Sequence, residues 1–116
     1  MATSGLPYIE PHVWEFERTI RLYLDDHEDS RSFISANLID SIDPSLVQQD
    51  SQGQYVVLTL FFPTHNGEEN SITVYFDVIL TDAHEFVLGN DVLTNYPYDN
   101  ERLLLDDGEV EIYTRR

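Results

Sequence analysis

Residues 55–62 read YVVLTLFF, and this stretch decides the fold. It is β-branched and aromatic, it is shorter than a typical globular helix, and Gly53 and Pro63 bound it. Successive side chains of a strand point to opposite faces, and here both faces are largely apolar. The stretch therefore predicts a central strand that is buried on both sides.

Two hairpins are predicted around this strand. Residues 72–80 alternate apolar with more polar side chains, and the turn-forming pair at 66–67 separates them from the central strand. That pattern is typical of a hairpin with one wet face. A second hairpin is predicted where 103–105 lead through Asp-Asp-Gly at 106–108 into an alternating stretch at 110–112.

The other segments carry weaker signals. Residues 33–42 place apolar side chains at even spacing and predict a strand. The N-terminal segment fits both helical and strand periods, and the compromise is a short helix over 10–17 followed by a strand over 18–25. We expect 83–100 to be mostly loop, with one helical turn after Asn90.

Length and composition set the class. The chain has 116 residues, of which 41% are hydrophobic and 12% aromatic, so we expect one domain, 1–116, with a single core. The expected fold class is α+β, dominated by an antiparallel β-sheet of hairpins with one short helix. With no cysteine, disulfides and thiolate chemistry are excluded. The sequence shows no signal peptide and no run of eighteen apolar residues, which favours a cytoplasmic protein without a membrane span.

The charge is strongly one-signed. The chain has six arginines, no lysine and 22 carboxylates, which gives a net charge of −16, and residues 32–101 contain no lysine or arginine at all. Like charges on one surface repel and weaken the compact state. Such a surface disfavours direct binding of nucleic acid and attracts proteins that are built to bind phosphates.

Enzyme-like sites find little support. Residues 25–30, DDHEDS, offer alternating oxygens but lack the glycine and the glutamate of a calcium loop. The four histidines are not paired at zinc-ligand spacing, and no nucleophile elbow, P-loop or dinucleotide-binding motif occurs. We therefore expect no catalytic residue, no metal and no cofactor, and a protein that is not an enzyme.

The acids are more informative as a pattern than as a site. Same-face residues of a strand lie about 6.8 Å apart, so acids at i and i+2 could form rows that stand in for phosphates. Two tyrosines among acids near the C-terminus suit a basic partner as anchors, although such tyrosines as often cover a core. The candidate partner-binding acids are Glu15, Glu17, Asp25, Asp26, Glu28, Asp29, Glu68, Glu69, Asp106, Asp107, Glu109 and Glu111, and the candidate anchors are Tyr96 and Tyr98.

Taken together, size, charge and these acid positions resemble the small acidic DNA-mimic proteins of bacteria and phages, closest to the class that binds the histone-like protein HU. The resemblance implies an inhibitor that occupies the DNA-binding surface of a basic DNA-binding protein, histone-like or nuclease, as a monomer or a dimer. Its carboxylates would accept arginine hydrogen bonds as phosphates do. No motif is shared, so the resemblance assigns no residue-level role.

Other interpretations stay open. The same electrostatics would suit an immunity protein that neutralises a basic nuclease toxin. A phage or mobile-element structural protein needs only the hairpins. Adaptation to high salt, or an acidic coat that merely keeps the domain soluble, would explain the charge without any partner.

Overall fold

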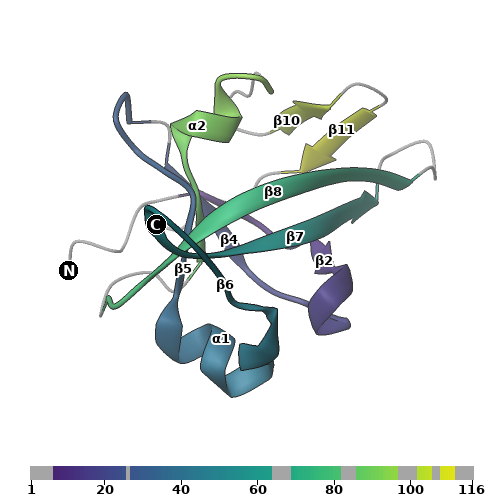
Figure 1. Ribbon diagram of the computed structural model, residues 1–116. Coiled ribbons are helices and arrows are strands. Elements are labelled where there is room, and N and C mark those ends of the chain that lie inside the picture. Colours follow the sequence, from purple (N-terminus) through teal and green to yellow (C-terminus); the bar gives the residue numbers. More distant parts are fainter. Residues whose placement is uncertain are drawn as a thin grey trace.

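A nine-stranded sheet dominates the computed structural model, which describes residues 7–25, 27–63, 69–81, 86–96, 102–105 and 108–111 (Figure 1). Its strands run in the order β1-β4-β9-β5-β8-β7-β2-β3, and β6 pairs with β7 off this path. The elements are β1 (Tyr8–Ile9), β2 (His12–Val13), η1 (Trp14–Phe16), β3 (Arg18–Thr19), β4 (Leu22–Leu24), β5 (Phe33–Ser35), α1 (Ala36–Ile42), η2 (Pro44–Leu46), β6 (Gln48–Asp50), β7 (Gly53–Pro63), β8 (Glu69–Ile79), β9 (Phe86–Leu88), α2 (Asn90–Leu93), β10 (Arg102–Leu105) and β11 (Gly108–Glu111).

The hairpin of β7 and β8 is the longest feature of the fold, and it confirms the strands predicted on either side of residues 66–67. The two strands pair antiparallel from Tyr55 opposite Asp77 to Pro63 opposite Glu69. The predicted burial on both sides is confirmed for one face only: from Val56 to Phe62 that face is buried, whereas the opposite face is only partly covered. The buried side chains are Val56, Leu58, Leu60 and Phe62. The turn residues 66–67 lie outside the described residues.

The sheet curls, because its two ends are joined by very little chain. β1 lies at one end of the strand order and β2 near the other, yet only Glu10 and Pro11 separate them. Three residue steps span about 10 Å at most, so the strands between must bend round to bring the ends together. The result is a curled, barrel-like half-shell that encloses the core.

The predicted helix in the N-terminal segment was wrong, and the predicted strand after it was too long. Instead of a helix over 10–17, the chain forms β2 and the single 3-10 turn η1; instead of one strand over 18–25, it forms the short strands β3 and β4. Glu17 follows η1 with φ of 54°, and this left-handed residue reverses the chain so that β3 can pair with β2. Neither the helical nor the strand period of the sequence could predict these elements, because each is only two or three residues long.

The prediction of a strand over 33–42 was half right. Residues 33–35 form β5, but Ser35 then caps α1, its hydroxyl accepting a hydrogen bond from the Asn37 amide at 3.2 Å. Ile39 is fully buried from the helical face, with Ile42 packed against the same core. The strand prediction relied on evenly spaced apolar residues, and this spacing leaves out Ile39, which the helix buries.

The sheet is mixed, and this corrects the prediction of antiparallel hairpins alone. β9 lies within residues 83–100, which we expected to be mostly loop, and it runs parallel to β4 and antiparallel to β5. β5 also pairs parallel with β8. The helical turn expected after Asn90 is confirmed as α2.

The second predicted hairpin is confirmed as β10 paired antiparallel with β11 in a sheet of its own. The molecule has a radius of gyration of 13.8 Å, close to the value of about 13 Å expected for a compact domain of this length. Within the described residues, no helix has the length and apolar composition needed to cross a membrane.

Candidate functional site: a cleft beside two crossing loops

Two loops cross at the ends of parallel neighbours β4 and β9. Asp25 follows β4, and its amide donates to the carbonyl of Leu88 at 3.0 Å. Gly89 follows β9 and lies against the backbone of Arg31, the residue that leads into β5. The carboxyl ends of adjacent parallel strands meet at one edge of a sheet, so the two loops that leave β4 and β9 lie close together.

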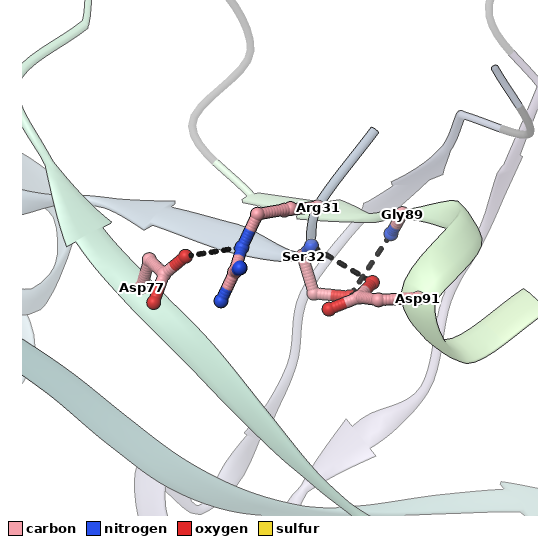
Figure 2. A network of polar contacts seen from close by, with 5 residues as sticks. All are labelled: Arg31, Ser32, Asp77, Gly89 and Asp91. Atoms are coloured by element: carbon pink, nitrogen blue, oxygen red, sulfur yellow. Dashed lines mark hydrogen bonds and ion pairs between the residues drawn. The ribbon is translucent and has the colours of Figure 1, made fainter. Parts of the chain in front are cut away.

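Ser32 connects these loops (Figure 2). It is 1% exposed, its amide and hydroxyl both donate to Asp91 Oδ1, at 3.0 and 2.8 Å, and its Oγ accepts from the Gly89 amide at 3.0 Å. A buried polar side chain is tolerated when its donors and acceptors are satisfied, as they are here. The network fixes the end of β9 and the start of α2 against the start of β5.

Gly89 is required by close approach rather than by its backbone angles. Its φ of −94° and ψ of −178° are open to any residue. A Cβ at this position, however, would lie 2.4 to 2.8 Å from three backbone atoms of Arg31. Any larger residue would therefore push the two loops apart.

The acidic turn that follows β4 is held by its own polar groups. The Asp25 carboxylate accepts from the His27 amide at 3.1 Å, and the Ser30 hydroxyl lies 2.6 Å from the carbonyl of Asp25 and 2.8 Å from that of His27. That hydroxyl oxygen also accepts from the Asn90 amide at 2.9 Å, which ties the turn to α2. Glu28 is exposed at the tip.

A cleft of about 440 Å³ opens beside the crossing loops. The turn between β6 and β7 forms one wall, and the end of β8, Ser32 and Asp91 form the other. Tyr75 is 63% exposed and stacks on Tyr55, with ring centroids 5.0 Å apart and planes within 11°. The volume falls in the range of roughly 300 to 1,000 Å³ that is typical of ligand pockets.

Arg31 and Asp77 both line this cleft and form an ion pair, with Nε 3.1 Å from Oδ2 (Figure 2). Both side chains are largely exposed, so the pair contributes about 0 to 1 kcal/mol to stability. The main effect of the ion pair is to orient the Arg31 guanidinium, whose other N–H groups can donate hydrogen bonds to a ligand. Among the described residues, no group of three or more His, Asp or Glu side chains is arranged to hold a metal ion.

The structure places the predicted partner-binding acids on separate elements. Asp25, Glu28 and Asp29 share the turn after β4, while Glu15 and Glu17 lie in and after η1 and so do not form a row along a strand. Glu69 begins β8, and Glu109 and Glu111 lie in β11 opposite Leu104 and Arg102. Asp26, Glu68, Asp106, Asp107 and Tyr98 lie outside the described residues. Tyr96 is partly buried against the core, the alternative weighed for it above.

Sequence reasoning missed the residues that build this site, namely Ser32, Gly89 and Asp91. The sequence does contain a signal. Phe86–Leu88 is a short apolar run followed by a glycine, which is typical of a buried strand that ends where another backbone segment comes close. Three residues are too few for periodicity to distinguish a strand from a loop.

Comparison with known proteins identifies the fold. No family model matches the sequence, and no curated protein matches it either. Among solved structures, the chain is similar to the retroviral protease-like domain of Ddi1 from Leishmania major, with a TM-score of 0.66 and 16% sequence identity. The match covers 97% of this chain and 92% of that domain, so the retroviral protease-like fold extends over the whole described molecule.

This finding overturns the DNA-mimic interpretation, which was wrong. It rested on charge and size, whereas the fold under the charged surface is similar to a retroviral protease-like domain. Net charge is a physical argument about association and solubility, and not about fold.

Proposed function

We propose that this chain is a peptide-binding domain that uses the retroviral protease-like fold to hold an extended polypeptide segment in the cleft, without cleaving it. A fold alone does not imply an activity, so the proposal depends on the site. The observation that carries it is how the described carboxylates around the cleft are used. Asp50, Asp77 and Asp91 line the cleft, and each accepts a hydrogen bond from a protein donor, respectively the Gln52 amide, the Arg31 guanidinium and Ser32.

Hydrolysis by an aspartic protease needs two carboxylates close enough to share one proton. Among the described residues, none of these three carboxylates is hydrogen-bonded to another carboxylate, and each instead positions a turn or a neighbouring side chain. The bonds of these carboxylates order the lining of the cleft before a ligand binds, and a pre-organised site loses less conformational freedom on binding.

An extended peptide has a clear way to bind. β6 pairs with β7 along one edge, and no described strand pairs with its other edge. All three of its residues are exposed. A peptide entering the cleft could add to this edge by main-chain hydrogen bonds, with its side chains meeting Tyr75 on one side and Arg31 on the other.

The test is selection from a displayed library of linear peptides, followed by affinity measurement on the selected peptide. Tyr75→Ala should weaken binding at least fivefold, because it removes the exposed wall of the cleft. Thr73→Ala is the matched control, since Thr73 lies two residues away on the same exposed face of β8 and outside the cleft lining. Failure to select any peptide, or equal effects of the two variants, would reject the proposal.

Peptide hydrolysis is the second candidate, favoured by one observation. Asp25 follows β4 where the two loops cross, and a second copy of the chain could supply the partner carboxylate. Incubation of the selected peptide with the protein between pH 4 and 7, with mass spectrometry of the products, separates the two. Intact peptide supports binding alone, whereas cleavage that is lost in Asp25→Asn establishes hydrolysis instead.

A further inference from the structure

Trp14 lies far from the cleft and is unusually exposed. It is the one tryptophan of the chain, it sits on η1, and 64% of it is accessible. Large aromatic side chains on a surface mark contact sites more often than small apolar ones do. A hollow of about 570 Å³ opens beside the ring, lined by His12, Glu15, Glu17 and Leu46.

We call Trp14 and the four residues that line the hollow with it the Trp14 surface. This surface is separate from the cleft. Trp14 contacts Phe61 near one end of β7, and the cleft includes Tyr55 near the other. Tyr55 and Phe61 are six residue steps apart along the strand, a distance of about 20 Å. In Figure 1, η1 and β2 lie across the molecule from the β6–β7 turn.

The ring is held in place before anything binds. It packs against Phe61 with centroids 5.9 Å apart. The next residue, Glu15, accepts from the Thr59 amide at 2.8 Å and from the Thr59 hydroxyl at 3.1 Å, which fastens η1 to β7. The Glu17 amide then donates to the Trp14 carbonyl at 3.2 Å. A pre-organised aromatic face loses little conformational freedom on binding.

The negative charge of the Trp14 surface favours a cationic binding partner. Glu17 is exposed and is the one non-glycine residue with positive φ among the described residues. Such backbone positions usually carry glycine or asparagine. Here Glu17 lines the hollow with an exposed acidic side chain. With the net charge of −16 behind it, the rim attracts a cation. Arg18 follows Glu17 but lies on β3 and does not line the hollow.

A guanidinium suits this surface better than an ammonium, because it is planar and stacks on an indole while donating to a carboxylate. The chain already contains the same kind of contact elsewhere: the guanidinium carbon of Arg21 lies 4.1 Å from the centroid of the Tyr8 ring. An arginine from outside would find at Trp14 a larger ring and an adjacent acid.

We propose that the Trp14 surface binds an arginine side chain presented by a partner protein, with the guanidinium on the indole face and hydrogen-bonded to Glu17. This contact is independent of peptide binding in the cleft and would remain if the cleft bound nothing.

The single tryptophan makes the test direct, since every indole signal in the protein comes from the proposed contact. The probe is the acetylated, amidated tripeptide Arg-Gly-Arg, titrated into ¹⁵N-labelled protein while the one indole N–H resonance is followed. The same peptide with lysine, and with the neutral isostere citrulline, provides the comparison. We expect a saturable shift with arginine, binding at least threefold weaker with lysine, and no saturable shift with citrulline.

Glu17→Gln should weaken arginine binding at least threefold while leaving the indole resonance observable. Glu28→Gln is the matched control, because it removes the same charge from an exposed turn that does not line the hollow. Equal weakening in both variants would show attraction to the general field and would overturn the proposal. A shift of equal size with citrulline, or no shift with any peptide, would also overturn it.

Discussion

Replacing Gly89 by alanine tests the crossing of the two loops most severely. The new methyl carbon would lie 2.4, 2.7 and 2.8 Å from the carbonyl carbon, Cα and nitrogen of Arg31. Carbon atoms in contact prefer a separation of about 3.5 to 4.0 Å, so the loops would have to move apart by about 1 Å. Backbone atoms cannot rotate away as a side-chain tip can.

The cost can be estimated from what that movement breaks. A shift of this size would lengthen the bond from the Gly89 amide to Ser32 Oγ, now 3.0 Å, beyond hydrogen-bonding range. Loss of the bond costs about 1 kcal/mol, and overpacking of a tight site costs a further 1 to 3 kcal/mol. Alanine also restricts the unfolded chain, which returns about 0.4 to 1 kcal/mol. The expected loss in the free energy of unfolding is about 1 to 3.5 kcal/mol.

The assay is equilibrium unfolding in urea, followed by far-ultraviolet circular dichroism, together with hydrogen exchange at the amide of residue 89. We expect a lower unfolding free energy and loss of protection at that amide. Gly53→Ala is the comparison: a Cβ there meets nothing within 4 Å, but φ is +135°, so its cost comes from backbone strain and protection at residue 89 should persist. A loss below about 1 kcal/mol for Gly89→Ala, or retained protection, would refute the reasoning.

Three further predictions use the same structure. Ser32→Ala should lower the free energy of unfolding by about 1 to 3 kcal/mol in urea titration, because the Gly89 amide and Asp91 lose a buried partner, and an unchanged midpoint would contradict the network. Glu15→Ala should cost about 1 to 2 kcal/mol by leaving the Thr59 amide without its acceptor, whereas Glu15→Gln, whose amide oxygen can still accept, should cost less; equal losses would argue against this bond. Raising sodium chloride from 20 to 500 mM at pH 8 should increase the melting temperature measured by calorimetry, because salt screens repulsion in a chain of net charge −16, and a decrease would mean that the charges are paired in attractive contacts.

The sequence by itself determined the long β7–β8 hairpin, the C-terminal hairpin and the turn after Asn90. In each case the local pattern is long enough, or the turn residues specific enough, that backbone and side-chain preferences agree. It also determined that the surface would be strongly acidic, since nearly all of that charge must remain in water. Charge did not determine the function class, because acids at similar spacing can decorate many folds.

Only the tertiary structure decided the remaining elements and the site. β9 is three residues long, and it forms a strand because it pairs with β4 on one side and with β5 on the other. Ser35 ends a strand and begins a helix because Ile39 can be buried from α1. Ser32, Gly89 and Asp91 meet across 57 to 59 residues of chain. Contacts of that range depend on how the sheet curls, and a local pattern carries no information about which distant backbone will arrive beside it.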